Sequence, residues 1–309
     1  MENTIHLQAY GYQAEICSQR GANLIDLSKG TMKSVRTPKQ FDDFTAEPFF
    51  WGCPILFPPN RISGASFRFE NRRYAFPVDE PHLGTFLHGR LHEQPFVCAF
   101  HTETEAVFFY QATNTKPYLS FPHAFTLTVR YVLQADGMHQ QVTLKNDSSQ
   151  NMPYALGFHT TFAVPFTADG QKHDIRLGLD VGREIVRDEN HLPTGEIIDD
   201  SPLRQALLND QINPCEHSFS HHFEMSGRHE MRLTDIGTKC WIHYRASDEY
   251  HYWMLYKGEG TDYLCVEPQT WMINSPNAPF HREETGFTAL RPLEERTMET
   301  VLSLEESNP

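Results

Sequence analysis

Apolar and polar residues alternate with a period of two along most of this chain, and this pattern constrains the fold more than any other feature. In residues 125–133 every second side chain is large and apolar, and Thr126, Thr128 and Arg130 lie between them. Asp136-Gly137 follows as a turn, and alternation resumes at residues 141–144, which predicts a β-hairpin. Apolar residues at helical spacing are rare. The sequence therefore predicts an all-β protein.

Other segments support the same fold class. Phe67 and Phe69, then Tyr74 and Phe76 across Asn71-Arg72, predict a second hairpin. Later strands are expected within residues 231–233, 240–244, 250–256, 263–266 and 298–304. We expect one short helix at residues 201–208, with Ser201 as N-cap and Pro202 at its first position.

The segments between the predicted strands suggest one large unit. Residues 30–60 and 268–296 lack periodicity and are predicted to be long loops, which are often functional. There is no internal repeat and no Gly/Ser-rich linker. We therefore expect residues 1–309 to form a single large antiparallel β-sandwich with a few short helices.

Charge and composition disfavour several classes of function. With 26 Lys and Arg against 40 Asp and Glu, the formal net charge is −14, which would not attract nucleic acid or an anionic membrane. The 6 cysteines are scattered without paired spacing and are expected to be reduced, mostly buried thiols. No signal peptide and no apolar run of about 18 residues is present, so we expect a soluble, cytoplasmic protein.

The number of histidines is unusual, at 17. His88 and His92 have the spacing of two metal ligands on one helix face, but Gly89 and Pro95 disfavour a helix there. We therefore expect no metal at this pair. The phosphate-binding, dinucleotide-binding, serine-hydrolase and zinc-protease motifs are all absent from the sequence.

Two residues stand out as an acid and base. Glu267 follows an apolar strand and precedes Pro268, which we expect to end the strand. A partly desolvated carboxyl has a raised pKa and suits a general base, although a Glu paired with an Arg would look the same. His159 lies between Phe158 and Phe162 and could supply the complementary acid, or be a structural histidine.

Donors for a polar ligand occur in two other segments. Asn60-Arg61 follows Pro58-Pro59 and offers an amide and a planar fork, which suit vicinal hydroxyls or a carboxylate. Arg61 could equally hold a buried acid. His88 precedes Gly89 and is expected to be a hydrogen-bonding loop residue.

Taken in order, these segments resemble the aldose 1-epimerase (galactose mutarotase) family. The resemblance rests on residues 58–62, His88-Gly89, residues 157–162 and residues 266–270, and it extends from about residue 11 to about residue 305. It implies the family's large mutarotase-like β-sandwich with a sugar on a concave face. It also implies an isomerase that uses no organic cofactor and no catalytic metal. We expect a monomer or homodimer whose partner is a small sugar rather than nucleic acid or a membrane.

The resemblance assigns roles by position. Glu267 takes the place of the general base and His159 that of the general acid. The substrate-binding positions are Asn60, Arg61, His88, Glu216 and Gln269. Opening a hemiacetal ring requires one proton to leave the anomeric hydroxyl while another reaches the ring oxygen, which agrees with an acid and a base in one site.

Two departures from the family pattern concern the substrate. Glu216, in Glu216-His217-Ser218-Phe219, stands where the family has an Asp, and Met254 stands where galactose-specific members have a Gln. The loss of that amide argues against galactose. Three alternatives stay open: a hexose-phosphate mutarotase, a non-catalytic sugar-binding protein of the same fold, and a histidine-rich metal-dependent enzyme.

Overall fold

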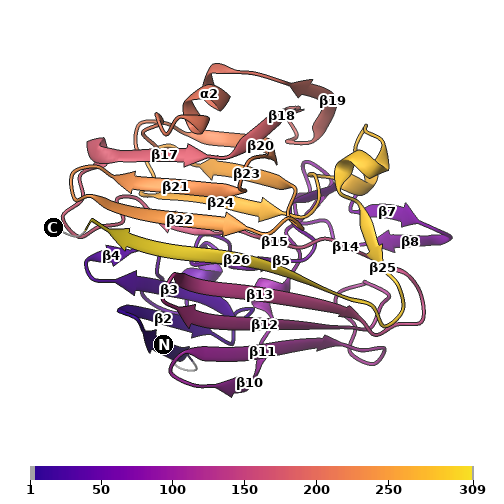
Figure 1. Cartoon of the computed structure of the whole chain (residues 1–309). Coiled ribbons are helices and arrows are strands. Elements are labelled where there is room, and N and C mark those ends of the chain that lie inside the picture. The colour runs from indigo at the N-terminus through magenta and orange to yellow at the C-terminus, as the bar shows by residue number, and fades with distance from the viewer. Residues whose placement is uncertain (1–3, 308–309) are drawn as a thin grey trace.

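The computed structural model describes residues 4–307, and antiparallel strands dominate its regular structure (Figure 1). The all-β class and the sandwich architecture predicted from the alternation are confirmed. The first large sheet has the order β10 (Val97–His101), β11 (Glu105–Ala112), β12 (Phe125–Gln134), β13 (Gly137–Asn146), β26 (Glu295–Glu306), β22 (Cys240–Ala246), β21 (Glu230–Asp235) and β17 (Ile175–Leu179).

The second large sheet carries the residues of most interest. Its order is β19 (Pro193–Ile198), β18 (Val181–Arg187), β20 (Phe219–Met225), β23 (Tyr252–Lys257), β24 (Tyr263–Gln269), β15 (Gly157–Phe158) and β5 (Ile55–Leu56), and β16 (Thr161–Ala163) also pairs with β24. The two sheets pack face to face: Tyr244 of β22 contacts the rings of Phe162 and Trp253 and hydrogen-bonds to Thr160.

Smaller elements complete the fold. The N-terminal sheet contains β1 (Thr4–Ala9), β2 (Tyr12–Cys17), β3 (Asn23–Lys29) and β4 (Met32–Lys33), and three strand pairs are β6 (Arg61–Ser63) with β9 (Thr85–Leu87), β7 (Ser66–Phe69) with β8 (Arg72–Ala75), and β14 (Met152–Tyr154) with β25 (Thr288–Leu290). The helices are α1 (Asp43–Ala46) and α2 (Pro202–Leu208), and the short 3₁₀ turns are η1 (Leu91–Glu93), η2 (Lys172–Asp174), η3 (Ser275–Asn277) and η4 (Arg282–Thr285).

Alternation on the central strands decides which side chains reach the core. On β24, Leu264 and Val266 belong to the main apolar cluster, whereas Glu267 lies on the opposite face. On β23, Leu255 is in the core, and its neighbour Met254 points the other way. The second sheet therefore has one face in the core and one face that is covered by loops.

Most local predictions hold. Helix α2 begins as expected, since the Ser201 hydroxyl accepts a hydrogen bond from the backbone N–H of Arg204. The hairpin of β7 and β8 pairs Phe67 with Tyr74. All six cysteines are free, and four of them are buried. In the part of the chain that the structure describes, no helix is long and apolar enough to cross a bilayer.

Two predictions about strand ends were wrong. The turn after β12 is formed by Ala135 and Asp136, and Gly137 is already the first residue of β13. Pro268 does not end β24, which continues to Gln269 and pairs Pro268 with Trp253. Val266 donates its N–H to Thr160, so the proline nitrogen two residues later faces the same side, at the break between β15 and β16.

The close packing of β13 against β26 at Gly137 can be tested by substitution. The φ of Gly137 is +138°, and a Cβ there would lie 2.5 Å from the carbonyl oxygen of Leu302 on β26. We expect Gly137→Ala to lower the free energy of unfolding by about 3 kcal/mol, because strain and overpacking add. At Gly30, where φ is +58° and no atom lies within 4 Å of the added Cβ, Ala should cost only about 1 kcal/mol. Urea denaturation measures both, and equal losses would contradict the packing argument.

Candidate active site

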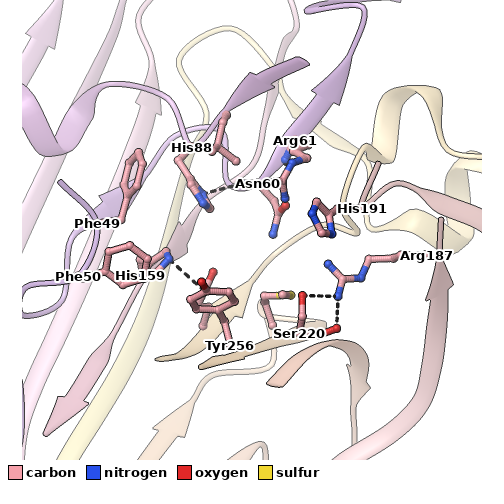
Figure 2. A pocket seen from close by; sticks show the side chains of 13 residues that line it. Phe49, Phe50, Asn60, Arg61, His88, His159, Arg187, His191, Ser220 and Tyr256 are labelled. Atoms are coloured by element: carbon pink, nitrogen blue, oxygen red, sulfur yellow. Dashed lines mark hydrogen bonds and ion pairs between the residues drawn. The ribbon is translucent and has the colours of Figure 1, made fainter. Parts of the chain in front are cut away.

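A cavity of about 230 Å³ lies on the loop-covered face of the second sheet (Figure 2). Its floor comes from neighbouring strands β20, β23 and β24, and its walls come from loops and from the ends of β6, β9 and β18. The lining residues are Phe49, Phe50, Asn60, Arg61, Leu87, His88, His159, Arg187, His191, Ser220, Met254, Tyr256 and Glu267. Five of the seven residues predicted to form the site, Glu267, His159, Asn60, Arg61 and His88, therefore line one cavity.

Glu267 is a buried carboxyl with little to stabilise its charge. Its exposed fraction is 2%, and Gln269 Nε2 donates to its Oε2 at 3.3 Å. Among residues 4–307, no Arg or Lys nitrogen lies within 4 Å of it, so the alternative of a Glu paired with an Arg is not observed. Burial raises its pKa to about 8, against a small opposing effect of Gln269 and two more distant arginines.

His159 is the carboxyl's direct partner. It lies between β15 and β16, and its backbone N–H donates to Pro54. Its Nε2 is 3.3 Å from Glu267 Oε1, and its Nδ1 is buried with no hydrogen-bond partner in the described chain. The rings of Phe49, Phe50 and His88 pack around it. This burial lowers the pKa of His159 to about 3.

The two shifts together fix how many protons the pair holds. Burial opposes ionisation of both groups, so near neutral pH the pair carries one proton and no net charge. Burial by itself favours that proton on Glu267. A proton shared over 3.3 Å can also be held by His159, which turns the pair into a carboxylate and an imidazolium.

His88 and Asn60, which both line the cavity, are joined by two hydrogen bonds. The backbone N–H of Asn60 donates to His88 Nδ1 at 3.2 Å, and the N–H of His88 donates to the Asn60 carbonyl. Because Nδ1 accepts, the proton of the neutral ring resides on Nε2. Burial and the nearby His159 hold the pKa of His88 well below its usual range, so this ring stays neutral. His88 therefore offers the cavity an N–H donor.

Gly89 explains the pairing of His88 with this wall. Its φ is +69°, and a Cβ there would lie 2.0 Å from the carbonyl oxygen of Phe57. Only glycine allows the two segments to approach so closely. Glycine at position 89 is thus required for the backbone conformation that holds the His88 ring at this wall.

Arg61 is partly committed elsewhere. Its Nε and one terminal nitrogen both donate to the carboxylate of Glu80 at 2.8 Å. Arg61 thus holds an acid, as the alternative interpretation expected, although Glu80 is only partly buried and the Arg61 side chain also lines the cavity. Its remaining terminal nitrogen makes no hydrogen bond within residues 4–307 and can serve a ligand.

The structure does not bring Glu216 or Gln269 to the cavity wall. Glu216 is exposed in the loop before β20, where Asn213 Nδ2 donates to it at 3.0 Å, so its predicted contact with substrate is not supported. Gln269 is fully buried on β24, and its side-chain amide donates a hydrogen bond to Glu267. Its position makes it a support for the carboxyl rather than a substrate ligand.

Several lining residues were missed from the sequence. Phe49 and Phe50 come from the loop after α1, and Tyr256 comes from β23 on the face that it shares with Met254. Arg187 at the end of β18 and His191 in the next turn complete the far wall. Only the alternation of β23, which places Tyr256 and Met254 on one face, could have pointed to any of them.

His92 lies near the site without reaching the cavity. Its ring packs on Phe49 with centroids 4.7 Å apart, and its Nε2 lies 3.5 Å from Oε1 of Glu93. It sits in the short turn η1 rather than in a helix, as expected from Gly89 and Pro95. Among residues 4–307, no group of three or more His, Cys, Asp or Glu side chains is arranged to hold a metal.

Comparison with known proteins supports the family and the fold. A family model described as Aldose 1-epimerase matches residues 3–303. A galactose mutarotase-like protein from Clostridium acetobutylicum is 27% identical, with 98% of this chain and 95% of that chain covered and a TM-score of 0.91. A protein described as a possible aldose 1-epimerase from Escherichia coli K12 is 18% identical, with 98% and 99% covered and a TM-score of 0.81.

A further solved structure extends the likeness of fold. The galactose 1-epimerase from Lactobacillus acidophilus NCFM is 16% identical to this chain, with 99% of this chain and 95% of that chain covered and a TM-score of 0.75. At this identity the likeness concerns the fold alone.

The raised pKa of Glu267 makes a prediction about stability. Folding raises this pKa from 4.5 to about 8, so the stability it contributes is full below about pH 4.5 and is lost as the pH rises through about 8. Glu267→Gln mimics the protonated carboxyl and lacks this loss. We expect the Tm of the variant, relative to the parent, to increase between about pH 5 and about pH 9. A difference independent of pH would show that burial does not hold Glu267 protonated.

Proposed function

The chain belongs to the aldose 1-epimerase family, and we propose that it interconverts the α and β anomers of an aldose by opening the sugar ring and closing it again. The observation that carries this proposal is the buried contact of 3.3 Å between Glu267 and His159 in a cavity lined with hydrogen-bond donors. A general base and a general acid, the two groups that proton transfer during ring opening needs, then lie side by side.

In the proposed reaction, Glu267 takes the proton of the anomeric hydroxyl while His159 Nε2 gives a proton to the ring oxygen. The bond between the anomeric carbon and the ring oxygen breaks, its electron pair stays on the ring oxygen, and the anomeric carbon becomes an aldehyde. Rotation about the bond to the next carbon presents the other face. Glu267 then returns its proton to the carbonyl oxygen while His159 removes the proton from the attacking hydroxyl.

The single proton of the pair suits this cycle. The reaction begins with the proton on His159 and reaches the open-chain sugar with a proton on Glu267, so no exchange with solvent is needed. A sugar hydroxyl that donates to the carboxylate stabilises the ionised form, which burial disfavours. We therefore expect substrate binding to move the proton from Glu267 to His159.

The remaining walls would hold the sugar in place. His88 Nε2 and the side-chain amide nitrogen of Asn60 are donors for ring hydroxyls, and Phe49 and Phe50 offer apolar faces to the sugar C–H groups. The volume of about 230 Å³ is small for a ligand pocket. We therefore expect a single sugar unit as substrate.

The first test removes each half of the pair. Glu267→Gln and His159→Asn should each slow anomer exchange by about 10²–10⁴-fold, since each deletes one proton-transfer group. Exchange NMR or polarimetry with pure anomers measures the rate. Glu103→Gln and His173→Asn serve as matched controls. Both residues are exposed and neither lines the cavity, so both variants should keep the parent's rate.

The same experiment distinguishes the non-catalytic alternative. A sugar-binding protein without activity would bind an aldose, as saturation-transfer NMR detects, yet leave anomer exchange at the spontaneous rate. Turnover by Glu267→Gln at the parent's rate would contradict the role of the carboxyl.

The pH dependence of activity is a second test. The pair loses its only proton as the pH rises through about 8, after which no acid remains for the ring oxygen. We expect kcat/KM to be level at neutral pH and to fall above an apparent pKa near 8, which reports the free enzyme. A rate that rises through this range would show that the deprotonated pair is the active form.

A further inference from the structure

Three basic side chains converge at the end of the cavity opposite His159. Arg187 ends β18, His191 lies in the turn that follows, and Arg61 begins β6 more than a hundred residues earlier. Figure 2 shows His191 between the two arginines, with Arg187 pointing into the cavity above Ser220. The sequence shows no such cluster, because strand pairing brings its members together.

Arg187 lacks hydrogen-bond partners for part of its guanidinium group among the described residues. One terminal nitrogen donates to the carbonyl of Ser220 and, at 3.0 Å, to its hydroxyl. Its other two nitrogens make no hydrogen bond, and no carboxylate lies within 4 Å of it among residues 4–307. A half-buried guanidinium without an anion is costly, and its fork matches a carboxylate or phosphate.

The acidic residues near this cluster already form hydrogen bonds or ion pairs with other groups or, in the case of Glu80, with Arg61. Glu80 is held by Arg61, and Glu184 accepts from His221 at 2.7 Å. Asp188 accepts the backbone N–H groups of its own turn, and Glu267 is paired with His159. Burial and the charge of Arg61 lower the pKa of Arg187 to about 10, and burial with the two arginines lowers the pKa of His191. Arg61 has Glu80 as its ion-pair partner, whereas Arg187 has no carboxylate within 4 Å among the described residues to offset its charge.

The distance across the floor fits a substituted sugar. Ser220 pairs with Tyr256 on β23, which in turn pairs with β24, so Ser220 lies two strand spacings, roughly 10 Å, from the strand of Glu267. Met254 occupies the floor between them and offers no hydrogen bond to a hydroxyl. A sugar whose anomeric carbon contacts Glu267 would direct its far substituent to Arg187.

We propose that the Arg187 end of the cavity binds an anionic group, a carboxylate or a phosphate, carried by the aldose at the end remote from its anomeric carbon. This inference rests on the proposed function for the position of the anomeric carbon. It makes a charged sugar, rather than a neutral aldose, the preferred substrate.

The test compares matched sugars. We expect kcat/KM for anomer exchange to be roughly 10–100-fold higher for glucose 6-phosphate or glucuronate than for glucose, the gain of charge-assisted hydrogen bonds. Whichever of the two anions is preferred identifies the substituent. Equal or better turnover of the neutral sugar would overturn the proposal.

Variants of Arg187 locate the effect. Arg187→Gln should remove most of the preference for the anion, and Arg187→Lys should keep part of it, because it retains the charge but loses the fork. Arg183→Gln is the matched control on the same strand: Arg183 is exposed and paired with Glu224, outside the cavity, so the preference should persist. A preference unchanged in Arg187→Gln would contradict the role of this residue.

Binding measured without turnover separates this inference from the proposed function. Calorimetry with glucose 6-phosphate, glucuronate and glucose reports affinity even if no sugar is anomerised. Tighter binding of an anionic sugar that depends on Arg187 would support the inference while the proposed function fails. Equal affinity for all three would overturn the inference whether or not the protein is an epimerase.

Discussion

The burial of one carboxyl beside one imidazole is the constraint on which the site depends. An isolated ionised carboxylate in such a place would cost several kcal/mol, and in the described chain no Arg or Lys nitrogen lies within 4 Å of Glu267, whose one close nitrogen partner of a titratable group is the imidazole of His159. Sharing a single proton with His159 removes that cost, since the pair is neutral as a whole. Gln269 supports the carboxyl from behind, and Phe49 and Phe50 shield the imidazole. The same arrangement that lets the pair be buried leaves it ready to exchange protons with a hydroxyl and a ring oxygen.

The walls of the cavity show where the chain accepts backbone strain. Asn60, His88 and His191 all have positive φ, at 59°, 60° and 62°. Such conformations cost about 1 kcal/mol or more for residues with a side chain, and they gather at functional sites. At Asn60 and His88 the strain fixes two donors against each other through reciprocal hydrogen bonds. These reciprocal hydrogen bonds hold Asn60 and His88 beside the reacting pair, whereas Arg187 at the other end of the cavity lacks partners for two of its nitrogens among the described residues.

Much of this could be predicted from sequence, for identifiable reasons. A period of two survives in any sheet, so the strands and the outward face of Glu267 follow from pattern alone. Glu267 and His159 were recognisable because polar titratable groups in apolar runs are rare. Arg187 and His191 were not, because no local signal reports that β18 lies three strands away from β24. Glu216 does not line the cavity, and its position could not be predicted because spacing along a loop does not say which way the loop turns. Pro268 was misjudged because a strand tolerates proline where its partner is interrupted.

The central claim is that Glu267 and His159 share one proton in the empty pocket and that a bound sugar moves it. Isotope-edited infrared spectroscopy of the Glu267 carboxyl, combined with the ¹⁵N chemical shifts of His159, measures the position of that proton directly. At neutral pH the account predicts a protonated carboxyl and a neutral imidazole without sugar, and a carboxylate with an imidazolium when a substrate or a ring-closed analogue is bound. A carboxylate beside a neutral imidazole in the empty protein, or a proton that stays on Glu267 in every complex, would contradict it.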